Sequence, residues 1–261
     1  EECMNAHWPK HKVYHKEQKQ WEKEHREGTV LEDDRSLAEA SALWAELTGD
    51  EYDKRCAAAM ALGVEGDLHA EAKAWRKIIK QWPGFPSPYY NLAIVLDRAD
   101  RVAEAAPMFL KAMELSEEGT ENWAEAVAAA FDLLKTPDCR DEPKPEWWND
   151  EGLKALSARV VAVAPDGPMP CVMRAGVLEG DALEEAVWNV GPRTAAEIKE
   201  AATWYQRAAM ATLTPSAKLD YEQYASKCDE YADPRLAKEE ADAAKARAAA
   251  EAEAAKARAA A

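Results

Sequence analysis

The residues best suited to chemistry stand in the first fifteen positions of the chain. Cys3 is followed by His7, His11 and His15, with Trp8 among them. Thiolate sulfur and imidazole nitrogen are interchangeable ligands in tetrahedral zinc sites, at bond lengths of about 2.0–2.3 Å. The residue types of this segment are therefore compatible with zinc chemistry.

The same segment resembles the closing half of a MYND-type zinc finger, which ends Cys-Gln-x-x-His/Asp-Trp-x-x-His-Lys-x-x-Cys. Cys3, Trp8, His11 and Lys12 stand at the family's spacing, and His15 takes the place of the last cysteine. The resemblance implies Cys3, His11 and His15 as metal ligands and zinc as the cofactor. It also implies two zinc ions. This sequence supplies one ligand to the first ion, Cys3, and two to the second, His11 and His15. We therefore expect a truncated finger with an incomplete ligand set.

An amphipathic N-terminal helix is the alternative interpretation, with Trp8 and Trp21 packed on the rest of the chain and the histidines exposed. In either case residues 1–27, with six basic and six acidic side chains, form a first segment distinct from the acidic middle of the chain.

No signature of a known catalytic site occurs along the chain. The patterns GxGxxG, GxxxxGK[ST], HExxH and GxSxG are absent. The remaining cysteines have no histidine nearby in sequence, and a free cysteine usually packs as a small apolar residue. We expect a protein that is not an enzyme, in a reducing compartment, either cytoplasmic or nuclear. Those cysteines are Cys56, Cys139, Cys171 and Cys228.

Negative charge is concentrated in the middle of the chain. The formal net charge is −16, and residues 28–234 carry 21 Lys and Arg against 38 Asp and Glu. An acidic surface repels phosphate groups, which disfavours nucleic acids and anionic membranes as partners and favours a basic protein or peptide. No apolar run approaches the roughly 20 residues that cross a bilayer, so no membrane partner is expected.

Two helical hairpins are predicted by apolar residues that recur about every 3.6 positions. The first covers residues 52–82 and turns at 63–67. The second covers 87–115 and turns at Asp100, with Ser87 as its N-cap and Pro88 in its first turn. If Gly66 and Asp100 mark equivalent turns, the hairpins repeat every 34 residues, and Trp75 matches Phe109, Ile78 matches Ala112 and Ala59 matches Ala93.

This period resembles that of the tetratricopeptide repeat. In residues 52–85, Pro83 takes the place of the family's proline, but Glu71 occupies a position that is small in the family, so we expect a local irregularity there. The resemblance implies an all-α, right-handed superhelix of antiparallel hairpins over residues 28–234. Residues 86–119 fit best, through Tyr89, Leu92, Ala93, Leu96, Ala105, Phe109 and Ala112.

Longer, irregular helical units are expected after residue 119. Their predicted helices cover 121–135, 146–164, 169–178, 194–213 and a capping helix at 216–231.

An Ala-rich tail, residues 235–261, closes the chain. Residues 237–261 contain 15 alanines, and one octet occurs at both 243–250 and 254–261. This composition predicts a helix without a strong apolar seam. A single solvated helix, a weak self-association element such as a coiled coil, and a nucleic-acid arm are the alternatives.

The first helix of each tetratricopeptide unit lines the concave groove of the stack. The resemblance therefore implies a partner-binding face in the second hairpin, although Asn91 is also a common consensus residue of the repeat. We expect a non-catalytic scaffold that binds a protein or peptide, with a zinc-binding MYND-type adaptor as the alternative. The implied partner-binding residues are Tyr90, Asn91, Ile94, Asp97 and Arg98.

Overall fold

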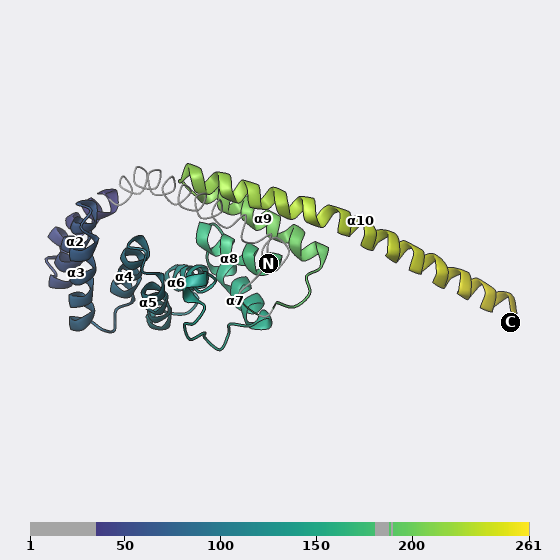
Figure 1. Cartoon of the computed structure of the whole chain (residues 1–261), viewed down its shortest axis with the longest axis horizontal. Helices are drawn as coiled ribbons and strands as arrows, with labels where there is room; N and C mark the ends of the chain where they lie inside the picture. The colour runs from purple at the N-terminus through teal and green to yellow at the C-terminus, as the bar shows by residue number, and fades with distance from the viewer. Residues whose placement is uncertain (1–34, 181–187, 189, 261) are drawn as a thin grey trace, which may run out of the picture. The chain divides into compact units, whose positions relative to one another are not determined.

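All regular structure in the described part of the chain is helical. The structure, a computed structural model, describes residues 35–180, 188 and 190–260, and no strand occurs among them. The predicted all-α class is confirmed for these residues. The chain divides into two compact units, Glu1–Leu115 and Ser116–Ala261 (Figure 1).

The described part of the first unit, residues 35–115, consists of consecutive helices joined by short turns. Each helix contacts the next, from α2 to α5. Asp50 and Asp67 cap the first two hairpin helices, since their carboxylates accept hydrogen bonds from the N–H groups of Tyr52 and Ala70. Residues 35–48 are also helical. The hairpin helices are α2 (Glu51–Val64), α3 (Leu68–Gln81), α4 (Pro86–Arg98) and α5 (Val102–Leu115).

The turns of the two hairpins have the same backbone structure. Gly66 and Asp100, which stand 34 residues apart, both have a left-handed conformation, with φ of 82° and 59°. Glycine and aspartate tolerate this region better than most residues. The same set of capping hydrogen bonds surrounds each turn residue, so the predicted 34-residue period is present in the structure. The N–H to O pairs are 65 to 61, 66 to 63 and 67 to 62 in the first turn, and 99 to 95, 100 to 97 and 101 to 96 in the second.

Residues that the period makes equivalent are also equally buried. Small residues at these positions let neighbouring helices approach, and large ones fill the space between them. The buried pairs are Ala59 with Ala93, Trp75 with Phe109 and Ile78 with Ala112.

The irregularity expected at Glu71 does not occur. Glu71 lies inside α3 and is only 6 % exposed. Its carboxylate lies against Gly63 of α2, where an added Cβ would come within 2.6 Å of Oε2. Trp75 Nε1 donates a hydrogen bond of 3.2 Å to Oε1. The missing side chain of Gly63 therefore makes room for the Glu71 carboxylate, so that α2 and α3 pack together although position 71 is not small.

The start of α4 also differs from the prediction. Helix α4 begins at Pro86, and Phe85 is its N-cap, without a side-chain capping bond. Ser87 is consequently inside the first turn and is not the cap. Pro86 and Pro88 fix the φ angles of a turn whose N–H groups need no intrahelical partner.

The second unit contains the two longest helices of the described ranges. The bounds of α6, α8 and α9 agree with the predicted ranges to within two residues. Helix α7 begins four residues later than predicted, at Asp150, because Asn149 accepts a capping hydrogen bond from the N–H of Gly152. Helix α10 continues far beyond the predicted capping helix at 216–231. The elements are α6 (Glu121–Leu134), η1 (Pro137–Cys139), α7 (Asp150–Val163), α8 (Pro168–Glu179), α9 (Ala195–Ala211) and α10 (Pro215–Ala260).

Helix α9 contributes to one core cluster of the second unit, which it shares with α8 and α10. It packs against α8 on one side and α10 on the other. Ile198 and Ala201 of α9 are fully buried, together with Cys171 of α8 and Cys228 of α10. The described cysteines are all free thiols.

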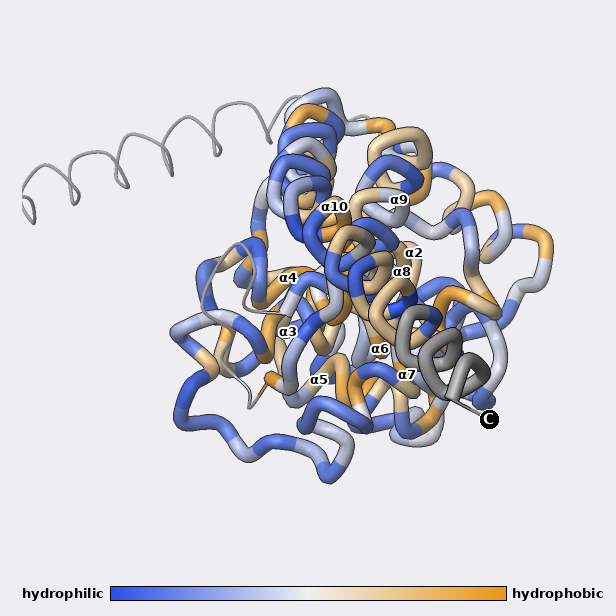
Figure 2. The backbone as a smooth tube through the Cα atoms, turned by 90° about the vertical axis from the view of Figure 1, so that its right-hand side faces the viewer, coloured by the Kyte–Doolittle hydropathy of each residue, from blue (hydrophilic) through white to orange (hydrophobic). Residues whose placement is uncertain are grey.

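Helix α10 is one continuous helix that passes through Pro234. It therefore crosses position 234/235, where the capping helix and the tail were expected to meet. Residues 237–239 and 241–251 are exposed, and this part of α10 extends away from α9 (Figure 1). In Figure 2 most of the labelled part of α10 is hydrophilic. None of the helices within the described ranges is both long enough and apolar enough to cross a membrane.

Candidate functional site

The predicted partner-binding residues share one face of α4. All five are half-buried, and their spacing of i, i+1, i+4, i+7 and i+8 places them on one side of the helix. The Tyr90 ring packs edge-on against Phe109 of α5, with 5.1 Å between ring centroids. Tyr90 is therefore part of the packing inside its hairpin as well as part of this face. The residues of the α4 face are Tyr90, Asn91, Ile94, Asp97 and Arg98.

The implied zinc ligands Cys3, His11 and His15 lie outside the described residues. Within the described ranges, no group of three or more His, Cys, Asp or Glu side chains could hold a metal ion.

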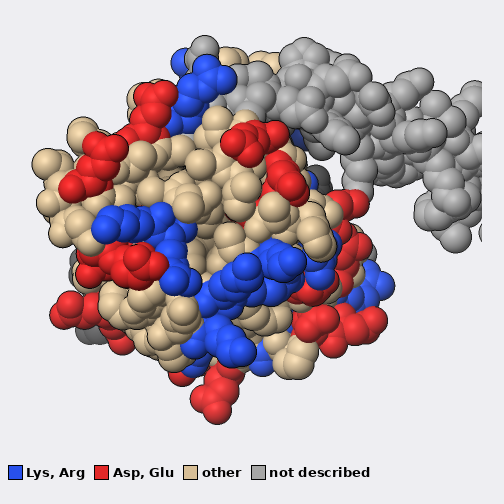
Figure 3. Space-filling view, turned by 90° about the vertical axis from the view of Figure 1, so that its left-hand side faces the viewer, with Lys and Arg blue, Asp and Glu red and all other residues tan. Residues whose placement is uncertain are grey.

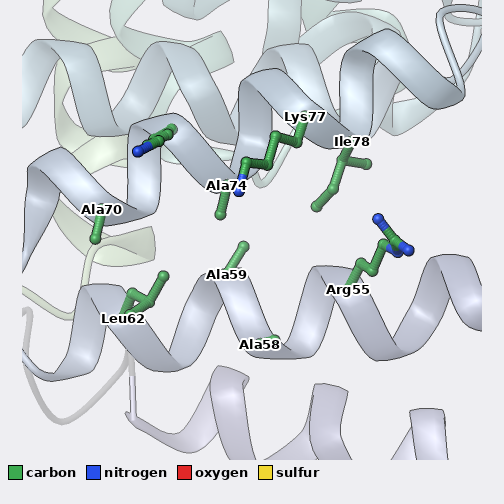
Figure 4. Close-up of a pocket in the computed structure, with 9 residues that line it drawn as sticks. Arg55, Ala58, Ala59, Leu62, Ala70, Ala74, Lys77 and Ile78 are labelled. Atoms are coloured by element: carbon green, nitrogen blue, oxygen red, sulfur yellow. The ribbon is translucent and has the colours of Figure 1, made fainter.

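A pocket of about 330 Å³ opens between α2 and α3 (Figure 4). It contains no residue of the α4 face. Its floor is apolar, because alanines on both helices leave space between the two backbones, while Ala59 and Ile78 are buried at its base. The lining residues are Arg55, Ala58, Ala59 and Leu62 of α2 and Ala70, Lys73, Ala74, Lys77 and Ile78 of α3.

The rim of this pocket is basic. Arg55, Lys73 and Lys77 line it, and no acidic residue within the described ranges does. Arg55 Nε donates a hydrogen bond of 2.7 Å to Glu51 Oε1, and its guanidinium lies 5.8 Å from the centroid of the Trp82 ring. Figure 3 views the molecule from the side on which α2 and α3 lie in Figure 1, and there a band of Lys and Arg side chains crosses the surface.

An aromatic cluster adjoins Arg55. The Tyr52 ring contacts Trp82 and Phe85, at centroid distances of 5.5 Å and 4.8 Å. Burial raises the pKa of the neighbouring Cys56 thiol to about 11. Cys56 is therefore protonated at neutral pH and is a poor nucleophile.

A buried polar cluster joins α8, α9 and α10 in the second unit. Glu179 lies 3.9 Å from the Cys228 thiol, measured from Oε2 to Sγ, and it also shares a hydrogen bond with Tyr205. Burial and the charge of Glu179 raise the pKa of Tyr205 well above its usual value, and they raise that of Cys228 to about 12. Both groups remain protonated, so the cluster is suited to holding three helices together rather than to nucleophilic chemistry.

Sequence reasoning did not identify the α2–α3 pocket or this polar cluster. The pocket has a signal in the sequence, since its lining positions recur every three or four residues in both helices. The cluster has none, because Glu179, Tyr205 and Cys228 are far apart in sequence.

A scan against family models found no match to this sequence, and a search of curated proteins found no similar chain. The arrangement of residues must therefore support any functional proposal by itself. In the first unit it offers two helical surfaces suited to binding, the α4 face and the α2–α3 pocket.

Proposed function

We propose that this protein is a non-catalytic, tetratricopeptide-like scaffold that binds a protein or peptide partner on its helical surface. The observation that carries the proposal is the 34-residue repetition of turn conformation, capping bonds and buried positions in α2–α5. Stacked hairpins of this kind present extended, preformed binding surfaces. A right-handed superhelix of hairpins is part of the proposal.

The partner surface we propose is the α4 face. Asn91 offers both a donor and an acceptor from one amide, and Ile94 adds apolar area one turn away. The excess of acidic side chains in residues 28–234 supports a basic partner.

Truncation of the α4 face tests this proposal. The purified chain is immobilised, proteins retained from lysate are identified, and the dissociation constant of each purified candidate is measured by calorimetry. Asn91→Ala and Ile94→Ala should weaken binding of the true partner about tenfold or more. Asn122→Ala, on the exposed surface of α6, is the matched control and should leave binding unchanged.

Two results would reject this assignment. If wild type and both α4 variants bound the partner with equal affinity, the binding site would not be the α4 face. If the affinity did not depend on salt concentration, the partner would not be recognised through basic charge, because salt screens the attraction between opposite charges.

A zinc-binding MYND-type adaptor is the second candidate, supported by the spacing of Cys3, Trp8, His11 and Lys12. The purified chain should contain well under one equivalent of zinc, because the ligand set is incomplete. Stoichiometric zinc that survives mild chelation in the wild type and is lost in Cys3→Ser would instead favour this candidate.

A further inference from the structure

The α2–α3 hairpin differs in charge from the acidic middle of the chain, residues 28–234, in which it lies. Residues 51–81 carry six Lys and Arg against five Asp and Glu, within a protein of net charge −16. Three of those cations line a single pocket, and no acidic residue of the described part of the chain lines it.

Two of these cations have no counter-charge among the described residues. Neither Lys73 nor Lys77 forms an ion pair or a hydrogen bond with any described residue, and both are exposed. They stand four residues apart on α3, where like charges repel each other. Arg55 has Glu51 as its ion-pair partner, and the two side chains are 42 % and 62 % exposed. Carboxylates of a ligand would therefore relieve an existing repulsion at Lys73 and Lys77.

The shape of the pocket indicates what would accompany those carboxylates. In Figure 4, Leu62 and Ala70 lie toward one end of the gap between the two helices, and Arg55 and Ile78 lie toward the other. The pocket volume of about 330 Å³ is at the lower end of the range for small-ligand pockets. The pocket therefore has room for one or two aliphatic side chains. It is too small to enclose a whole helix.

We propose that this pocket binds an acidic amphipathic helix of a partner protein. Aliphatic side chains of that helix enter the apolar gap, and carboxylates one turn apart on it pair with Lys73 and Lys77. The match follows from geometry, since residues four apart on any α-helix are separated by about 6 Å along the axis. This site is separate from the α4 face and has the opposite charge preference.

Fluorescence anisotropy on the full chain tests the proposal. The probe is a labelled synthetic amphipathic helix of about five turns, with leucine on one face and glutamate elsewhere, and the control peptide has glutamine in place of glutamate. The glutamate peptide should bind at least about tenfold more tightly than the glutamine peptide.

Variants of the protein then separate charge from shape. The double variant Lys73→Glu/Lys77→Glu should weaken binding of the glutamate peptide about tenfold or more. Ala74→Leu, which fills the gap without changing charge, should weaken it as well. Lys80→Glu, an exposed lysine of α3 outside the pocket, is the matched control and should change the affinity less than about twofold. Circular dichroism of each variant verifies that the helices are retained.

Three outcomes would overturn the proposal. One is equal binding of the glutamate and glutamine peptides. Another is unchanged affinity in Ala74→Leu. A third is binding of single-stranded DNA that depends on Lys73 and Lys77 but not on Ala74, since this would make the rim a general anion surface and not a helix-binding pocket.

Discussion

Replacing Gly63 by alanine should destabilise the first unit, because the added methyl group has no room. Its Cβ would lie 2.6, 2.8 and 2.9 Å from Oε2, Cδ and Oε1 of Glu71. The carboxylate cannot swing aside without cost, since Glu71 is buried and accepts a hydrogen bond from Trp75. Overpacking costs about 1–3 kcal/mol, whereas alanine in an unobstructed helix gains about 1 kcal/mol over glycine. The expected net loss is about 1 kcal/mol.

Removing the obstruction should reverse the sign of this effect. In a Glu71→Ala background, Gly63→Ala should stabilise the helix, which gives a coupling of about 2 kcal/mol between the two positions. Hydrogen exchange of the α2 and α3 amides in the full chain measures the local opening free energy. Gly84→Ala is the matched control, because a Cβ there meets nothing within 4 Å. If Gly63→Ala were as stable as Gly84→Ala, or if the effect were the same in both backgrounds, the close contact between Gly63 and Glu71 would be refuted.

Three substitutions test contacts in the second unit by thermal unfolding. Gly152→Ala should cost about 1–3 kcal/mol, because its Cβ would lie 2.5 Å from the Trp147 carbonyl oxygen; an unchanged melting temperature would contradict this. Asp150→Asn should cost about 1.5–3 kcal/mol at neutral pH, because Arg193, with a side chain 4 % exposed, would lose an ion pair of 2.6 Å. Burial acts to raise the pKa of Asp150, but the hydrogen bond and charge of Arg193 outweigh it and lower the pKa below 3.8. The difference between wild type and Asp150→Asn should therefore shrink as pH falls through that lowered pKa, and a difference that is constant with pH would refute the pairing. Glu125→Gln should stabilise the unit at neutral pH, because burial raises the pKa of Glu125. That gain should disappear as pH falls toward 4.5, the group's usual value, and an equal gain at both pH values would contradict it.

Local signals predicted most of the helices correctly. The 3.6-residue period and the turn residues Gly66 and Asp100 depend on short-range interactions. Because these turns are 34 residues apart, the same spacing also predicted which residues of the two hairpins are equivalently buried. The start of α4 was predicted wrongly. Ser87 was expected to be the N-cap because serine is a good capping residue, but Pro86 and Pro88 favour a helix that begins earlier, at Pro86.

Features that depend on contacts between side chains far apart in sequence could not be predicted from local sequence patterns. A glutamate at a small-residue position predicts irregularity until the facing glycine is known, and the pairing of Gly63 with Glu71 is set by how α2 packs on α3. The pocket likewise requires alanines from both helices to face each other, and the Glu179 cluster requires three helices to meet. The α4 face was predicted from a resemblance, and its role in binding stays a prediction.

Helix α10 is continuous in geometry but has two different sources of stability. Ala225, Cys228 and Ala232 are buried against the second unit's core, whereas the described side chains of 237–251 are exposed. The outer part depends on alanine's helix propensity and on its own hydrogen bonds, which are marginal for an isolated segment of this length. It should therefore fray progressively from its outer end while the inner turns open only when the unit unfolds. With a rise of about 1.5 Å per residue, a fluorophore at residue 260 would stand about 36 Å from one at Leu236 when the helix is formed, so energy transfer between them would report its melting directly.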